Sequence, residues 1–155
     1  MIWAIEIEDV CRRHNLPVDL VHAIVQTESS GDPWAYRYEP AFYQNYIKNK
    51  PFKVYGHVSL ETEMNGLATS WGLMQTMGVV ARERGYTRGY LTELCKPEYA
   101  LEYGCRQLKH LEQRYGDLGW DAVISAYNAG SPKRRDITGE FLNQSYVTKV
   151  RHLMG

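Results

Sequence analysis

Glu28 is the side chain in this sequence that is best placed for acid–base chemistry. In helical steps it continues the apolar stripe of Val21, Ile24 and Val25, at the spacing i, i+3, i+4, i+7. A carboxyl group at the end of such a stripe points towards a core or a cleft wall, where desolvation raises its pKa. Such an acid can hold a proton near neutral pH and give it to a leaving group. A half-exposed Glu in the last turn of a helix, without any function, is the alternative interpretation of the pattern.

The hydrophobic periodicity that positions this acid predicts a mainly helical protein. Helices are expected at about 4–14, 17–29, 40–47, 70–84, 97–116, 120–128 and 140–153. The clearest stripe belongs to the helix at 97–116 and consists of Ala100, Leu101, Gly104, Cys105, Leu108 and Leu111. No strong strand is expected, although Val54 and Tyr55 could be extended.

Length and composition restrict the class of protein. A chain of 155 residues is long enough for one domain, 1–155, with a real core. Its 18 basic and 18 acidic residues balance, which argues against a nucleic-acid partner. Three Cys at irregular spacing make no disulfide framework, and five His show no ligand spacing, so neither a metal nor a cofactor is expected.

The N-terminal segment is too short and too acidic for a signal peptide, and no apolar run reaches the length of a membrane span. We therefore expect synthesis in the cytoplasm without a recognisable export signal. The protein is expected to be a monomer.

Residues 34–68 interrupt the helical rhythm and carry many aromatic side chains. These are Trp34, Tyr36, Tyr38, Phe42, Tyr43, Tyr46, Phe52 and Tyr55. Aromatic faces stack on the apolar faces of sugars as well as on one another, so either ligand contacts or ordinary packing of an irregular lobe explains them.

Four short elements stand in a defined order along the chain. They are ES at 28–29, GLMQ at 72–75, AYNAG at 126–130 and YVTKV at 146–150. Together they resemble the soluble lytic transglycosylases and the related goose-type lysozymes, over about 17–154 except 34–68. The resemblance implies a mainly α, lysozyme-like domain with a substrate cleft. It also implies cleavage of the β-1,4 bond between N-acetylmuramic acid and N-acetylglucosamine in peptidoglycan glycan strands.

The resemblance also implies roles for individual residues. Glu28 is the expected catalytic acid/base, and the expected substrate-binding residues are Ser29, Met74, Gln75, Tyr127, Asn128 and Tyr146. Considered without the resemblance, Tyr127 and Tyr146 could pack between helices, and Met74 is more often plain core. Gln75 is harder to explain as structure, since a buried amide needs hydrogen-bond partners.

In a lytic transglycosylase one carboxylic acid suffices, because the C6 hydroxyl of the substrate replaces water and closes a 1,6-anhydro ring. Ordinary glycosidases use two carboxyl groups. The stretch 34–68 looks like an insertion between ES and GLMQ, and we expect it to form part of the cleft wall. It brings the additional carboxylates Glu39, Glu61 and Glu63, with Asp32 just before it. Among these, Glu39 and Asp32 are the candidates for a second carboxylate in the cleft. Either one could position a water and make the protein a muramidase, that is, a true hydrolase.

A catalytically silent peptidoglycan-binding module is the hypothesis from another class, but such a module has no need for an acid on an apolar stripe. Action on the cell wall would suit a phage endolysin, a phage virion enzyme or a secretion-system-linked bacteriolytic enzyme. Gly78 stands where many relatives have Pro, and we expect it only to loosen the turn after GLMQ.

Overall fold

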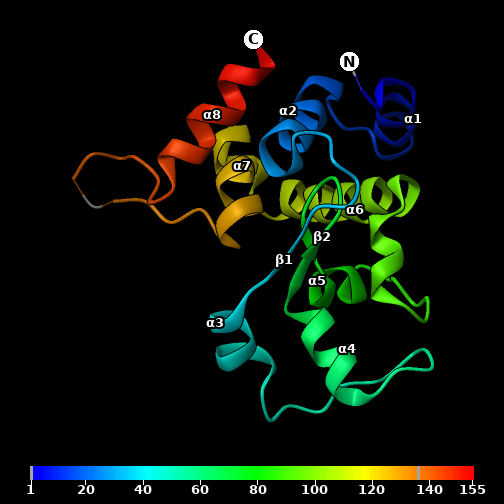
Figure 1. Ribbon diagram of the computed structural model, residues 1–155. Helices are drawn as coiled ribbons and strands as arrows, with labels where there is room; N and C mark the ends of the chain where they lie inside the picture. Colours follow the sequence, from blue (N-terminus) through cyan, green and yellow to red (C-terminus); the bar gives the residue numbers. More distant parts are fainter. Residues whose placement is uncertain (1, 136) are drawn as a thin grey trace.

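The computed structural model describes residues 2–135 and 137–155 and shows helices arranged around a small antiparallel sheet (Figure 1). The α-helices are α1 (Ala4–His14), α2 (Val18–Ser29), α3 (Pro40–Phe42), α4 (Leu60–Leu67), α5 (Gly78–Glu83), α6 (Pro97–Tyr115), α7 (Trp120–Ala129) and α8 (Gln144–Met154). A π-helical turn at Tyr43–Ile47 and 3₁₀ turns at Leu91–Cys95 and Gly116–Leu118 accompany them. The strands β1 (Tyr36–Tyr38), β2 (Thr69–Trp71) and β3 (Thr76–Met77) pair antiparallel in the order β1-β2-β3. The predicted mainly helical class is confirmed.

Buried apolar side chains of the described residues form two clusters, one on each side of the molecule. The larger cluster joins α1, α2, α6, α7 and α8 and includes Leu20, Ile24, Leu101, Leu108 and Val123. The smaller cluster lies around α4 and α5 and includes Ile47, Leu67, Ala81, Tyr86 and Leu94. In Figure 1 the helices of the larger cluster occupy the upper part, and the sheet with α3, α4 and α5 occupies the lower part. The two clusters define two lobes.

Helix α6 follows its predicted stripe, since all six predicted residues are buried. Pro97 occupies its first turn, where a missing N–H removes no intrahelical bond. At Gly104 the side chain of Met74 packs directly on the helix backbone, and a Cβ there would overlap it. The helix therefore packs closely against the GLMQ element at the junction of the lobes.

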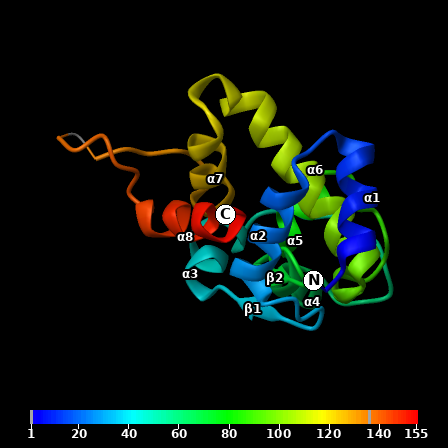
Figure 2. The same cartoon turned by 90° about the horizontal axis from the view of Figure 1, so that it is seen from above.

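Helix α2 buries one full face and places Glu28 in its last turn. It ends where Ser30 adopts a left-handed conformation (φ 53°), and the Ser30 N–H bonds back to the Gln26 carbonyl at 3.2 Å. Helix α8 packs against α2, and the two helices lie next to each other in Figure 2. Residues far apart in the sequence are thereby brought to the C-terminal end of α2.

The prediction of one helix over 70–84 is wrong. The chain forms β2, a tight turn, β3 and only then α5. Gly72 (φ 71°) and Gln75 (φ 49°) have left-handed backbone conformations that interrupt a helix. A Cβ at Gly72 would lie 2.5 Å from the Leu94 carbonyl oxygen, so the turn requires glycine. Pairing of β2 with the remote strand β1 overrides the local helical pattern, and the expectation of no strong strand fails for the same reason.

Three further features differ from prediction. Helix α4 was not expected, although Ser59 caps it by accepting a 3.0 Å hydrogen bond from the Thr62 N–H. Helix α8 begins at Gln144, not near 140, because Arg134 and Phe141 form an antiparallel bridge before it. Val54 and Tyr55 belong to no strand. The helix expected at 40–47 is present as α3 and the π-helical turn.

Gly78 has a stricter role than expected. It begins α5, and a Cβ at this position would collide with the backbone carbonyl oxygen of Gly66 in α4. The two helices can approach this closely only because Gly78 has no side chain. The glycine therefore tightens the junction of α4 and α5 instead of loosening the turn.

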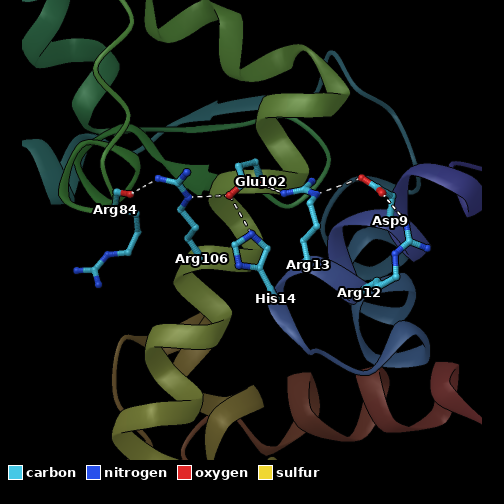
Figure 3. A network of polar contacts seen from close by, with 7 residues as sticks. All are labelled: Asp9, Arg12, Arg13, His14, Arg84, Glu102 and Arg106. Carbon is cyan, nitrogen blue, oxygen red and sulfur yellow. Dashed lines mark hydrogen bonds and ion pairs between the residues drawn. The ribbon is translucent and has the colours of Figure 1, made fainter.

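A polar network joins α1 to α6 (Figure 3). Glu102 accepts hydrogen bonds from Arg106 (2.7 Å), from Arg13 and from the His14 ring (2.8 Å). Arg106 also donates to the Arg84 carbonyl at 3.1 Å, which ties the end of α5 to α6. Burial raises the pKa of Glu102, but the hydrogen bonds from Arg13 and Arg106 outweigh it and lower the pKa to about 2.

Among the helices of the described residues, none combines the length and apolarity needed to cross a bilayer.

Candidate active site

A cavity of about 770 Å³ lies between the two lobes, and we call it the central cavity. The C-terminal ends of α2 and α7 contribute Thr27, Glu28 and residues 126–130 to its wall. The opposite side comes from the sheet, from α3 with the π-helical turn and from the start of α5. The stretch 34–68 contributes the wall residues Arg37, Glu39, Phe42 and Tyr46.

Glu28 is half-buried in this wall and has a specific partner. The Tyr146 hydroxyl, from α8, donates to Glu28 Oε2 at 2.7 Å. Burial raises the pKa of Glu28, while the Tyr146 hydrogen bond and the positive charge of Lys149 offset part of the increase. The desolvation expected from the helical stripe is thus confirmed. Because Tyr146 occupies Oε2, a proton on Glu28 is best accommodated on Oε1.

Two tyrosines lie near this acid, and each donates a hydrogen bond through its hydroxyl. The Tyr127 hydroxyl donates to the Met74 carbonyl at 2.7 Å and links α7 to the GLMQ turn. Burial, followed by the nearby charge of Glu28, raises the pKa of Tyr127 and of Tyr146 well above the usual value. Both phenols therefore keep their protons at neutral pH. Tyr127 lines the central cavity, whereas Tyr146 lies behind Glu28.

Ser29 connects the acid-bearing helix to the GLMQ turn. Its Oγ lies 2.8 Å from the Leu73 carbonyl and 3.1 Å from the Val25 carbonyl, and it accepts from the Gly31 N–H at 3.2 Å. These contacts orient the end of α2, and Ser29 is not among the residues that line the central cavity. Direct contact of Ser29 with a substrate remains a prediction.

Met74 and Gln75 occupy opposite sides of the GLMQ turn. The Met74 side chain is fully buried against Gly104, in keeping with the core alternative. Gln75 lines the central cavity, and its Nε2 donates to the carbonyls of Ala35 (3.0 Å) and Gly72 (2.9 Å). Both amide hydrogens are therefore engaged, which leaves the Oε1 acceptor for a ligand.

Asn128 also lines the central cavity, and its Oδ1 accepts from Asn143 Nδ2 at 3.0 Å. Asn143 is in turn bonded to Ser125, through Ser125 Oγ–Oδ1 (2.6 Å) and Nδ2–carbonyl (3.0 Å) contacts. Sequence reasoning missed Asn143 and Ser125. Ser125 could have been noticed in the sequence, because it lies within the apolar helix predicted at 120–128. A buried serine there needs a hydrogen-bond partner.

Thr27 is a second residue that sequence reasoning missed. It precedes Glu28 on α2 and lines the central cavity. Its hydroxyl is buried and has no hydrogen-bond partner in the part of the chain that the structure describes. Such a hydroxyl is suited to form a hydrogen bond with a ligand, because a buried hydroxyl without a hydrogen-bond partner is unfavourable.

The two candidates for a second carboxylate occupy different environments. Glu39 lines the central cavity with Glu28, and its Oε1 lies 3.2 Å from Arg37 Nε. Asp32 accepts the Trp34 N–H at 2.9 Å in the turn after α2 and is not part of the cavity wall. The structure brings Glu39, and not Asp32, to the central cavity.

No group of three His, Cys, Asp or Glu side chains that could hold a metal ion occurs among residues 2–135 and 137–155.

A helical fold with a desolvated acid at the end of a helix, facing a cavity between two lobes, defines a lysozyme-like domain. The chain belongs to the Transglycosylase SLT domain family, which matches residues 7–144. No curated protein and no solved structure matches it significantly. Membership in this family indicates an enzyme of the lytic transglycosylase type that acts on cell-wall peptidoglycan.

Proposed function

We propose that this protein is a peptidoglycan lytic transglycosylase that cleaves the β-1,4 bond between N-acetylmuramic acid and N-acetylglucosamine and leaves 1,6-anhydromuramic ends. The observation that carries the proposal is the environment of Glu28: half-buried, with a raised pKa, and in the wall of the central cavity. An acid of this kind is suited to protonate a leaving group near neutral pH.

The proposed reaction has two proton transfers, both through Glu28. Glu28 Oε1 first gives its proton to the glycosidic oxygen, and the bond from that oxygen to C1 of muramic acid breaks. The carboxylate then accepts the proton of the C6 hydroxyl while the C6 oxygen bonds to C1, so no water is consumed. The Tyr146 hydroxyl stays bonded to Oε2 and supports the carboxylate formed between the two steps.

The neighbouring residues serve as positioning and binding groups in this proposal. Gln75 and Asn128 line the central cavity, where they can form hydrogen bonds with acetamido and hydroxyl groups of the glycan. Tyr127 and Ser29 hold the GLMQ turn against α7 and α2. Residues 34–68 supply the opposite wall, including the ring of Tyr46.

Mass spectrometry of digested sacculi tests the reaction directly. We expect muropeptides with 1,6-anhydromuramic ends, which have the mass of the reducing product minus one water. In water enriched in ¹⁸O these products should carry no label. Predominantly reducing, labelled ends would reject the transglycosylase reaction.

A muramidase is the second candidate, and the position of Glu39 favours it. Glu39 shares the central cavity with Glu28, as a base that activates water would have to. Its Oε1 lies 3.2 Å from Arg37 Nε, which also lines this cavity. Reducing ends from the wild type, together with loss of turnover in Glu39→Gln, would establish this hydrolase.

A further inference from the structure

The β1–β2 pair separates the central cavity from a second cavity of about 570 Å³, which we call the back cavity. The cross-strand partners Arg37 and Ser70 line the central cavity. Their neighbours Tyr36, Tyr38 and Trp71 line the back cavity. Side chains alternate between the two faces of a strand, so one thin wall serves both cavities.

The wall of the back cavity carries aromatic rings that remain open to solvent. Tyr36 stacks on Trp71 with ring centroids 6.0 Å apart and an interplanar angle of 23°. Tyr36 is 70% exposed, and Tyr90, which also lines the cavity, is 44% exposed. Trp71 is held in place because its Nε1 donates to the Gly66 carbonyl at 3.0 Å. Aromatic rings gathered around one hollow and left in contact with water are typical of a binding surface.

Apart from Glu63, the polar groups of the back cavity are uncharged. Thr62, Asn65 and Thr92 offer hydroxyl and amide groups to its interior. Glu63 is the charged side chain among the described lining residues. It is 2% exposed and accepts a hydrogen bond from Arg82 at 2.9 Å. A charged ligand would find no free counter-charge on these walls, so the lining favours a neutral one.

We propose that the back cavity binds a neutral N-acetylated sugar unit of a glycan chain, at a site separate from the place of cleavage. The rings of Tyr36, Trp71 and Tyr90 would stack on the apolar face of the pyranose. Asn65 and Thr92 would bond its acetamido and hydroxyl groups. The volume falls within the range of about 300–1,000 Å³ that is common for ligand pockets.

This inference rests on the proposed function, which identifies the ligand as a glycan. The lining, which offers no free charge, favours one type of sugar unit over the other. Sugars without a carboxylate, such as N-acetylglucosamine, fit the back cavity better than N-acetylmuramic acid with its lactyl group and peptide stem. Because both cavities share the β1–β2 wall, occupation of the back cavity would hold the enzyme on an insoluble polymer next to the strand that is cut.

NMR titration of Glu28→Gln with tetra-N-acetylchitotetraose tests the proposal without turnover. We expect shifts of the Trp71 indole N–H signal, which reports the back cavity, and of the Gln75 side-chain amide, which reports the central cavity. The double change Tyr36→Ala and Tyr90→Ala removes two rings, and each ring contributes about a 2–10-fold factor in affinity. It should weaken the Trp71 response at least about 5-fold and leave the Gln75 response in place.

Leu118→Ala provides the matched control, since Leu118 is 64% exposed and belongs to neither cavity. It should leave both responses unchanged. Shifts at Gln75 without shifts at Trp71, or a Trp71 response that survives the double change, would overturn the back-cavity site and leave the proposed function standing.

A response of Trp71 alone would support the back cavity and remove support from the proposed function. Silence of both reporters would reject both proposals. Shifts at Trp71 caused by a free stem peptide, and not by the sugar, would show that the ligand class is wrong.

Discussion

The exchange Glu28→Gln should abolish activity without weakening the fold at neutral pH. Glutamine has nearly the same shape and keeps an oxygen that can accept the 2.7 Å hydrogen bond from Tyr146. It cannot donate the proton that the leaving group needs. Removal of a general acid lowers the rate by about 10²–10⁴-fold.

The effect on stability follows from the direction of the pKa shift of Glu28. Burial raises the folded-state pKa above the ordinary value of 4.5, and the contributions of Tyr146 and Lys149 do not cancel that increase. Between the unfolded and the folded pKa, the native state binds more protons than the unfolded state. The free energy of unfolding must therefore fall as pH rises through this window, and the full penalty is present above the folded pKa.

Glutamine does not ionise and escapes this penalty. The variant should be at least as stable as the wild type at pH 7–8, and the difference should shrink as pH falls towards 4.5. A gain of about 1 kcal/mol in a protein of this length would raise the melting temperature by roughly 2–4 °C. The loss of attraction to Lys149 works in the opposite direction and keeps the net gain small.

Matched melting curves of both proteins from pH 4 to 8, with turbidity clearing of purified peptidoglycan, provide the measurement. A Gln variant that melts well below the wild type at neutral pH would show that Glu28 is a structural carboxylate stabilised by its partners. Clearing at more than about a tenth of the wild-type rate would place the general acid elsewhere.

Three further predictions follow from particular contacts. Tyr146→Phe removes a hydrogen bond that lowers the pKa of Glu28, so the alkaline limb of the pH–rate profile should move to higher pH; an unmoved limb would show that this bond does not act on the catalytic acid. Glu102→Gln should destabilise the protein by about 1–2 kcal/mol at neutral pH in urea titrations, because charge-assisted bonds from Arg13 and Arg106 are lost. The folded pKa of Glu102 is lowered to about 2, so this difference should be complete above about pH 4.5 and vanish as pH falls towards 2; a difference that does not depend on pH would contradict the assignment. Gly78→Ala should lower the free energy of unfolding by about 3 kcal/mol, because the new Cβ meets the Gly66 carbonyl. In the control Gly116→Ala the new Cβ would lie 3.7 Å from the Glu112 side chain, so the melting temperature should change little. Equal effects of the two substitutions would refute the packing argument.

Helices with a complete apolar stripe could be predicted from the sequence, because burial on one face imposes a 3.6-residue period that local reading detects. Helix α6 has all six expected residues in the core, and α2 ends where expected. The same period placed Glu28 at the edge of the core and predicted the direction of its pKa shift. Helix α4 was missed because it lies in the irregular stretch 34–68, although Ser59 marks its start.

The sheet and the GLMQ turn could not be predicted in this way. The pairing of Arg37 with Ser70 joins residues 33 positions apart, and such a long-range bond leaves no local period. Gln75 has a left-handed backbone that it adopts because the surrounding turn is held by Gly72 and by the Ala35 carbonyl. Short strands of two or three residues are too brief for an alternating pattern to be recognised.

The sequence by itself determined the chemistry available to this protein: one acid at the end of an apolar stripe, four motif elements in order, and an aromatic-rich stretch between the first two. The tertiary structure alone decided which groups meet. It turned Ser29 towards the Leu73 carbonyl, brought Tyr146 to Glu28, and placed Glu39 but not Asp32 in the central cavity. The physical reason is that residue types and helical faces are local properties of the chain, whereas contacts between distant segments arise only when the two lobes pack together.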